Sequence, residues 1–247
     1  MNITLIAPTF KRNDICNRLI NSVPDWINII IVSLSDSENI IKKENVIIME
    51  AEQMPLTNAL NLGVRIADNY YPETEAHLLT DDDVYFTKDT IIKDNIFDLL
   101  KKKDTGLVGI TRIINSVKLE NRHIISPHVY KGGGWFIRKE VFHAIGGFTN
   151  NNSADEWDIC IKSYVNGYVN YRTKSCYAYH KQATATGGYK SAIAESKSLG
   201  LVNNYMFKYV SKHIQNVAKY ENLSGKKTKF NLYAKTLHSQ NNKKLKE

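Results

Sequence analysis

The sequence predicts an α/β protein built on a central, mostly parallel sheet, and three observations carry this prediction. Short apolar runs alternate along the first half of the chain with stretches whose apolar residues recur at helical spacing. One run, Ile27 to Val32, is continuous and β-branched, which is typical of a parallel strand covered on both faces. At 247 residues, 43% of them hydrophobic, the chain is long enough to bury the core of one large domain.

The elements of the first half follow from the local pattern. Four apolar runs predict strands, at Ile3–Ala7, Ile27–Val32, Val46–Met49 and His77–Thr80. Two stretches with apolar residues on one helical stripe predict helices between these strands, at Asn13–Val23 and Leu56–Ala67. Such alternation implies a Rossmann-like sheet, with its ligand crevice at the carboxyl ends of the strands.

The second half is less regular. A helix at Asp89–Leu100 and a strand at Leu107–Thr111 are followed by a polar stretch that reaches Tyr130 and by a run of three glycines. Two further helices are predicted, each closed by glycine, at Lys139–Ala144 and Ala154–Val165, and a strand follows at Cys176–Tyr179. A polar loop with two glycines, Thr184–Tyr189, is either a mobile cover for a ligand or an ordinary turn.

The formal net charge of +8 is concentrated at the C-terminal end. Residues 201–247 contain ten lysines, no arginine and two glutamates, whereas the first 200 residues balance 23 basic against 23 acidic side chains. From about Asn204 the spacing predicts a helix with one apolar and one basic face, followed by a lysine-rich tail. We therefore predict a main domain over residues 1–200 and a helical basic extension over residues 201–247.

The expected location is the cytoplasm. The longest apolar stretch, Ile27 to Leu34, is far shorter than the roughly 20 residues of a transmembrane helix, and the N-terminus has no secretory pattern. Cys16, Cys160 and Cys176 are odd in number and widely spaced, which suits reduced and mostly buried thiols.

Asp81, Asp82 and Asp83 follow the strand predicted at His77–Thr80 and form the principal candidate site. Three adjacent carboxylates at the mouth of a parallel sheet repel one another, so a cation is expected to offset that repulsion. Mg²⁺ and Mn²⁺ take oxygen ligands and keep positions free for diphosphate oxygens when one or two carboxylates hold them. The alternative is a solvated acidic turn that caps the helix near Asp89.

Several segments, in the expected order, resemble the GT-A glycosyltransferases, and glycosyltransferase family two in particular. The segments are Ile6-Ala7-Pro8-Thr9-Phe10-Lys11-Arg12, Asn58-Ala59-Leu60-Asn61-Leu62-Gly63, Leu79-Thr80-Asp81-Asp82-Asp83, Gly133 to Phe142, Ile145-Gly146-Gly147-Phe148 and Asp155-Glu156-Trp157-Asp158. The third segment is similar to the DxD motif of these enzymes. The resemblance runs from residue 3 to about residue 180 and implies a GT-A catalytic domain that transfers a sugar from a nucleotide, with inversion expected.

The resemblance implies which residues hold the donor and the metal. The donor, expected to be a UDP-sugar, is assigned to Pro8, Thr9, Phe10, Arg12, Asp36, Asn61, Asp81 and Asp82. Asp36 is the nearest substitute for the aspartate of an Asp-Asp-Gly-Ser turn, which this chain lacks. Mn²⁺ or Mg²⁺ is expected on Asp83 and Asp81, and His180 is implied as a further ligand, with a purely structural histidine as its alternative.

The resemblance also implies an acceptor side. Gly133, Gly134, Trp135 and Trp157 are assigned to acceptor binding, and the acidic pair Asp155–Glu156 to catalysis. Glu156 matches the base that takes the proton of the acceptor hydroxyl, although the order of the pair is exchanged. The alternatives are that Asp155 caps the helix that follows and that the tryptophans fill the core.

The basic extension provides the hints about the acceptor. Lysines without arginine favour phosphate contacts over the reading of base edges, so double-stranded DNA is a candidate partner. By analogy with the DNA glycosyltransferases of T-even-like phages, we expect the acceptor to be hydroxymethylcytosine in phage DNA, or a sugar already attached to it. In that case the expected location is the host cytoplasm. The alternatives are a bacterial surface-polysaccharide or lipid-linked glycan transferase, and a non-catalytic DNA- or glycan-binding protein on the same fold.

Overall fold

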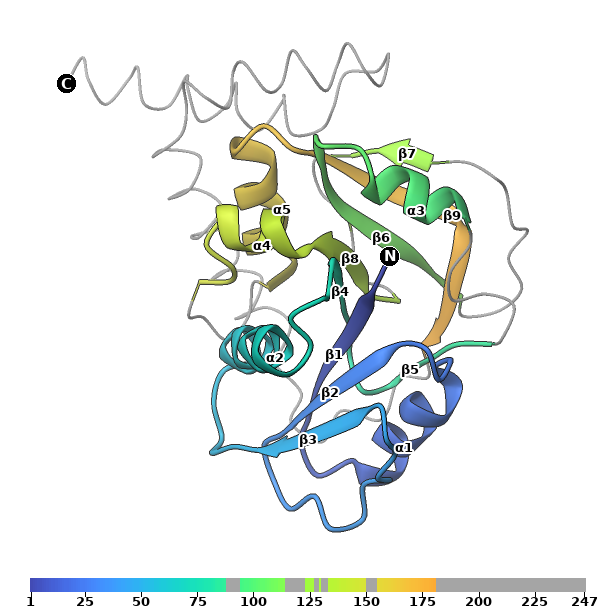
Figure 1. Ribbon diagram of the computed structural model, residues 1–247, viewed down its shortest axis with the longest axis vertical. Helices are drawn as coiled ribbons and strands as arrows, with labels where there is room; N and C mark the ends of the chain where they lie inside the picture. Colours follow the sequence, from blue (N-terminus) through green and yellow to red (C-terminus); the bar gives the residue numbers. More distant parts are fainter. Residues whose placement is uncertain (88–93, 114–122, 127–128, 130–132, 150–154, 181–247) are drawn as a thin grey trace, which may run out of the picture.

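The computed structural model describes residues 1–87, 94–113, 123–126, 129, 133–149 and 155–180 (Figure 1). In chain order its elements are β1 (Ile3–Thr9), α1 (Asn13–Ser22), β2 (Asn28–Ser33), β3 (Val46–Glu50), α2 (Leu56–Tyr70), β4 (Ala76–Leu79), β5 (Val84–Tyr85), α3 (Asp94–Leu100), β6 (Thr105–Ile113), β7 (His123–Ile125), β8 (Trp135–Arg138), α4 (Lys139–Ala144), α5 (Asp155–Val165) and β9 (Val169–His180). The basic extension over 201–247 and the loop at 184–189 lie outside the described residues.

The described strands form a nine-stranded sheet in the order β3-β2-β1-β4-β8-β6-β9-β5, with β7 paired to β9. Strands β3, β2, β1 and β4 are parallel neighbours, and β8 runs antiparallel between β4 and β6. Because β9 is parallel to β6, six of these strands share one direction, against β5, β7 and β8. The predicted α/β fold with a mostly parallel central sheet is confirmed.

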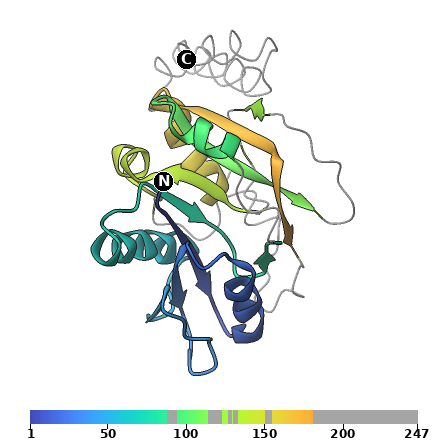
Figure 2. The ribbon, with the colours of Figure 1, turned by 45° about the vertical axis from the view of Figure 1, so that its right-hand side comes forward.

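Helices cover both faces of the sheet. Alternate residues of β1 point to opposite layers, so that Leu5 packs in the core cluster of α1 and α3, whereas Ile6 packs in that of α2 and α4. Figures 1 and 2 show α1 and α2 on opposite sides of the parallel strands. Burial on both faces explains why these strands read as continuous apolar runs.

Three strands, β5, β7 and β8, were not predicted. The apolar run that becomes β8 continues without a turn residue into α4, which hides its strand character in the sequence. The two-residue β5 pairs antiparallel with the end of β9, where Val84 lies opposite His180. Together β4, β5, β8 and β9 surround the segment that carries the three aspartates.

Candidate functional site

The three aspartates occupy the turn between β4 and β5, at the carboxyl end of a central strand. Asp82 is 1% exposed and Asp83 is also buried, while Asp81 is half-buried. The adjacent strand β1 ends at Thr9, so the turn and the loop after β1 lie side by side. This is the edge at which an open α/β sheet binds its ligands.

Asp82 is held by the loop that follows β1. The Thr9 hydroxyl donates to Oδ2 of Asp82 at 2.7 Å, and the Arg12 guanidinium donates to Oδ1 at 2.5 Å. A second guanidinium nitrogen of Arg12 lies 3.7 Å from Oδ2 of Asp83. Burial raises the pKa of Asp82 to about 6, although the Thr9 hydrogen bond and the Arg12 charge act in the opposite direction. A buried carboxylate is thus retained with an arginine as its counter-charge.

The residues around this turn suit Mn²⁺ or Mg²⁺ in kind. Asp81 and Asp83 offer carboxylate oxygens, the donors that these cations prefer. The pairing of Val84 with His180 brings the backbone of His180 next to Asp83, while the His180 side chain lies outside the described part of the structure. Within the described residues, no three His, Cys, Asp or Glu side chains are already grouped to hold a metal. Arg12 lies beside Asp83, one of the two aspartates on which that cation is expected.

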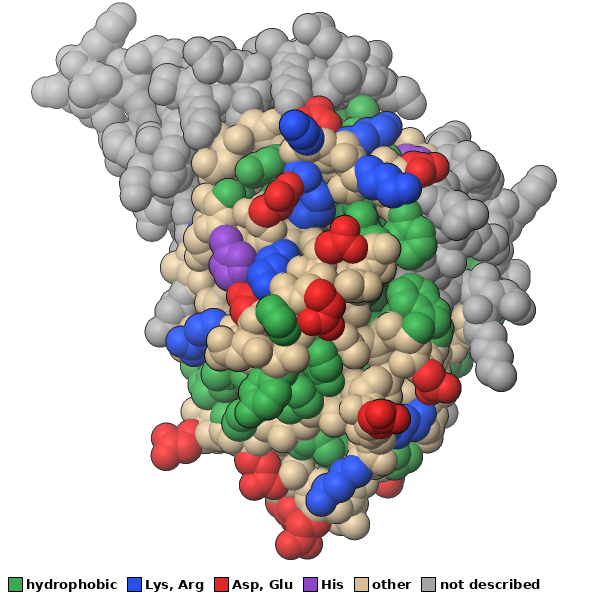
Figure 3. Space-filling model, in the orientation of Figure 1, with side chains coloured by type: hydrophobic (Ala, Val, Ile, Leu, Met, Phe, Trp, Pro, Cys, Tyr) green, Lys and Arg blue, Asp and Glu red, His purple; other side chains and the backbone are tan. Residues whose placement is uncertain are grey.

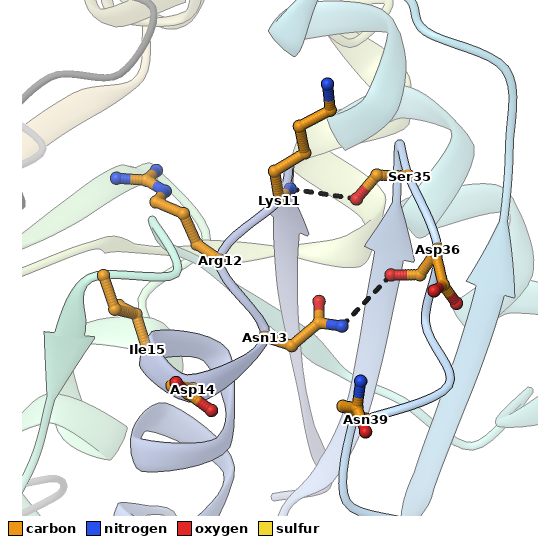
Figure 4. Close-up of a pocket in the computed structure, with 8 residues that line it drawn as sticks. All are labelled: Lys11, Arg12, Asn13, Asp14, Ile15, Ser35, Asp36 and Asn39. Carbon is orange, nitrogen blue, oxygen red and sulfur yellow. Dashed lines mark hydrogen bonds between the residues drawn. The ribbon is translucent and has the colours of Figure 1, made fainter.

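A pocket of about 570 Å³ opens beside Arg12, between the loop after β1 and the loop after β2 (Figure 4). It is lined by Lys11, Arg12, Asn13, Asp14, Ile15, Ser35, Asp36 and Asn39. In Figure 4 the Arg12 side chain points away from Asp36, and its ion pairs place it toward the aspartates. The pocket and the acidic turn therefore share one side chain.

Backbone contacts fix the shape of this pocket. Lys11 has a φ of 53°, an uncommon value for a residue with a Cβ, and its N–H donates to the Ser35 hydroxyl at 2.9 Å. The Asn13 amide donates to the carbonyl oxygen of Asp36 across the pocket at 3.1 Å. The carboxylate of Asp36 accepts the N–H of Glu38 at 2.8 Å. Asp36 thus lines the pocket beside Arg12, and its predicted contact with the donor stays a prediction.

Two other residues assigned to the donor lie in the strand or at its end. Pro8 is buried in β1 opposite Val32, and Phe10 is half-buried just after the strand. The Nζ atom of Lys11 lies 5.1 Å from the centre of the Phe10 ring. Pro8 therefore contributes to the sheet, and Phe10 to the surface of the loop.

The side-chain amide of Asn61 holds a neighbouring loop. Its amide nitrogen donates to the carbonyl oxygen of Phe148 at 2.9 Å, and its Oδ1 accepts the N–H of Phe148 at 3.0 Å. Both ends of the amide therefore hold the loop after α4, and the predicted donor contact stays a prediction. Asn61 also borders a second pocket of about 530 Å³ with Arg65 and His143.

The same loop is held from its other side by α5. Asp158, 1% exposed, accepts the N–H and the hydroxyl of Thr149 at 2.5 and 2.9 Å. Lys162, one helical turn later, lies 3.7 Å from Asp158 and donates to the carbonyl oxygen of Gly147 at 2.7 Å. In the sequence Asp158 appears only as the last residue of the segment Asp155-Glu156-Trp157-Asp158, and the signal for its structural role was the lysine four residues later on the same helix.

The residues expected on the acceptor side pack inside the protein where they are described. A Cβ on Gly133 would lie 2.6 Å from Ala178, and one on Gly134 would lie 2.9 Å from the carbonyl oxygen of Leu79. Trp135 is fully buried and donates its indole N–H to Val129 at 2.9 Å. Trp135 thus has the core role that the sequence left as the alternative, and the glycines allow close packing beside the acidic turn.

Three predicted site residues have side chains outside the described part, namely Asp155, Trp157 and His180. Glu156 lies half-buried in the first turn of α5, directly after the residues 150–154 that are not described. Its position next to the loop held by Asp158 is compatible with the predicted base, and that role stays a prediction.

The described surface carries mixed charge. On the face shown in Figure 3, acidic and basic side chains are interspersed and form no broad basic area within the described part. This agrees with the balanced charge of the first 200 residues. Among the described helices, none has the length and apolar character needed to cross a bilayer.

The fold is that of known glycosyltransferases. The crystal structure of TarS from S. aureus superposes with a TM-score of 0.61 at 15% identity, covering 94% of this chain and 45% of TarS. A shorter form of TarS in complex with UDP-GlcNAc gives 0.57 at 13% identity, covering 91% of this chain and 82% of that one. The mannosyltransferase PcManGT from Pyrobaculum calidifontis, in complex with GDP-Man and Mn²⁺, gives 0.57 at 15% identity, covering 84% and 64%.

These likenesses lie in structure and far less in sequence. No protein-family model matches the chain, and no curated protein matches its sequence. The chain spans less than half the length of the first TarS structure. The shared feature is therefore the GT-A architecture.

Proposed function

We propose that this protein is a glycosyltransferase that uses a nucleotide-sugar donor and a divalent cation. The observation that carries the proposal is the turn Asp81–Asp83 at the carboxyl end of β4, beside an open pocket formed by the loops after β1 and β2. Structures of the same fold were solved with UDP-GlcNAc and with GDP-Man and Mn²⁺. A UDP-sugar is the preferred donor, because the structures of TarS with UDP and UDP-GlcNAc are among the similar ones.

Each part of the site has a task in this reaction. The pocket lined by Ser35 and Asp36 receives the nucleoside, and its edge at Arg12 directs the diphosphate toward the acidic turn. Asp81 and Asp83, with His180, would hold Mn²⁺ or Mg²⁺, which supplies Lewis-acid stabilisation of the leaving diphosphate. Glu156 takes the proton from the attacking acceptor hydroxyl, consistent with an inverting transfer.

The acceptor proposal rests on the chain outside the described residues. The lysine-rich segment 201–247 carries the whole charge excess and favours a polyanion, with hydroxymethylated cytosine in DNA as the first candidate. A surface-polysaccharide or lipid-linked glycan acceptor is the second candidate, because one fold can serve many different acceptors.

The test is transfer from radiolabelled UDP- and GDP-sugars, with Mn²⁺ or with a chelator, to unmodified and hydroxymethylated duplex DNA and to glycan acceptors. Asp83→Asn is expected to lower metal-dependent donor turnover at least ~100-fold, because charge stabilisation by a metal contributes several kcal/mol to the transition state. The control is Asp98→Asn, which changes an exposed carboxylate of α3 and should leave turnover unchanged. Turnover that is insensitive to both the chelator and Asp83→Asn would refute the proposed function.

A further inference from the structure

The side chain of Arg12 occupies an unusual place for a residue at the end of a helix. Arg12 is the N-cap residue of α1, and its carbonyl oxygen accepts the N–H of Cys16 at 3.0 Å, while its side chain makes no capping hydrogen bond. The backbone of Arg12 is thus anchored in the helix, and its guanidinium reaches across to two aspartates of another turn.

The two contacts of this guanidinium are unequal. Asp82 lies 2.5 Å from one nitrogen, is almost fully buried, and has a second hydrogen bond from Thr9. Asp83 lies 3.7 Å from the other nitrogen, a distance at which the attraction is electrostatic with no good hydrogen bond. Asp82 is therefore the fixed anchor of the arginine, and Asp83 is the carboxylate that a competing cation can take over.

The guanidinium is also within reach of a ligand. The Arg12 side chain is 29% exposed and lines the 570 Å³ pocket, whereas the two aspartates it contacts are buried. A diphosphate that enters from this pocket offers bidentate acceptors to a planar guanidinium, a stronger match than a single long contact. A positive charge beside Asp83 opposes a divalent cation until the anion draws it away.

We infer that Arg12 is an internal counter-cation that couples metal binding to nucleotide binding. In the ligand-free protein it neutralises Asp82 and Asp83 and weakens the affinity of the turn for a divalent cation. A bound nucleoside diphosphate attracts the guanidinium, releases Asp83, and so raises the affinity for the cation. Because such coupling is reciprocal, the cation raises the affinity for the nucleotide by the same factor. This inference rests on the proposed function, and within it Arg12 makes the binding of the nucleotide and the binding of the cation depend on each other.

The experiment measures Mn²⁺ binding to the full chain through the electron paramagnetic resonance signal of free Mn²⁺, with and without UDP, corrected for the Mn²⁺ that UDP binds in the absence of protein. Wild type is expected to bind Mn²⁺ about ten times more tightly with UDP, within the usual range of coupling between two sites. Arg12→Gln is expected to bind Mn²⁺ alone more tightly than wild type and to show a smaller enhancement by UDP, because only the part due to direct ligation of the cation by the diphosphate remains. Arg12→Lys keeps the positive charge and should stay close to wild type in the absence of UDP.

The matched control is Arg65→Gln, which removes the same charge from an exposed position on α2, and circular dichroism checks that each variant is folded. Equal Mn²⁺ affinity of wild type and Arg12→Gln without UDP, while wild type still turns over donor, overturns the inference and leaves the proposed function intact. Absence of Mn²⁺ binding in every variant, together with turnover unaffected by chelator, overturns both.

Discussion

Two buried carboxylates in this protein have almost the same surroundings, but their basic partners differ in how accessible they are to a ligand. Asp82 and Asp158 are both 1% exposed, both accept a threonine hydroxyl, and both face a basic side chain. Asp82 lies in the turn after β4 beside an open pocket, whereas Asp158 lies within α5.

The two sites differ in the solvent exposure and the other contacts of the basic side chain that pairs with the aspartate. Lys162 is 13% exposed and also donates to the carbonyl of Gly147, so it is committed to internal contacts. Arg12 is 29% exposed and lines a pocket, so its charge is available to an incoming anion. The same chemical pairing thus fixes a loop at one site and remains open to exchange with a ligand at the other.

The largest expected effect is the loss of stability when the pair Asp158–Lys162 is broken. Asp158→Ala leaves the Thr149 N–H and the Lys162 ammonium without their carboxylate, and removing one partner of a buried ion pair costs about 3–5 kcal/mol. We expect a loss of that size in the free energy of unfolding, measured by urea denaturation. Asp98→Ala, which alters a side chain that is 72% exposed and 4.0 Å from Lys101, should change it by less than about 1 kcal/mol. Equal losses of stability in the two variants would show that the contacts of Asp158 with Thr149 and Lys162 do not stabilise the fold.

His77 extends the comparison to a buried group without compensating hydrogen bonds. It is fully buried in β4, neither ring nitrogen has a hydrogen-bond partner within the described residues, and Asp68 lies 3.8 Å away. Burial lowers its pKa to about 4, with the Asp68 charge acting to raise it and His143 and Lys139 to lower it further.

Because the unfolded chain takes up the His77 proton near pH 6.5 and the folded chain does so only near pH 4, stability falls as the pH drops between these values. The contribution of His77 to that fall is as much as about 3 kcal/mol. His77→Leu should therefore show a shallower decline from pH 6.5 to pH 4 in thermal melts. An unchanged slope would mean that groups other than His77 account for the decline.

The smallest effects compare two glycines with positive φ. Gly134, with a φ of 115°, packs against Leu79 and Thr80 just before the aspartates, whereas a Cβ on Gly146, with a φ of 77°, would have no atom of the described residues within 4 Å. Gly146→Ala carries backbone strain alone and should cost about 1 kcal/mol, and Gly134→Ala adds a steric clash and should cost about 2 kcal/mol or more. Parallel urea titrations of both variants test this order, which fails if Gly146→Ala is the more destabilising change.

The sequence predicted the parallel half of the sheet well, since β1, β2 and β4 are buried on both faces and the half-buried edge strand β3 is also an apolar run. It predicted β9 only at its end, as Cys176–Tyr179, although the strand begins at Val169. The missed part contains Thr173 and Ser175, which are buried with their hydroxyls 2.7 Å apart. A polar pair that satisfies itself inside the core cannot be told from a loop by its composition.

For the candidate site, the sequence located the acidic turn and the loop after β1 but not their connection. The salt bridges of Arg12 to Asp82 and Asp83 join residues about 70 positions apart, which neither spacing nor local pattern can reveal. The hydrogen bonds of Asn61 to Phe148, which join residues 87 positions apart, were hidden in the sequence for the same reason. Motifs identify which residue types gather at a strand end, and tertiary packing decides which of them stay free for a ligand.

A buried cysteine lies near each of the two carboxylates, Asp82 and Asp158, and its rate of alkylation can report when that region of the protein opens. Cys16 lies one turn beyond Arg12 in α1, with a pKa raised to about 12 mainly by burial, and Cys160 lies two residues beyond Asp158 in α5. Thiols in such surroundings react with alkylating reagents only when the structure around them opens. Alkylation followed residue by residue with mass spectrometry would therefore time the opening of the two regions separately, in one unmodified protein.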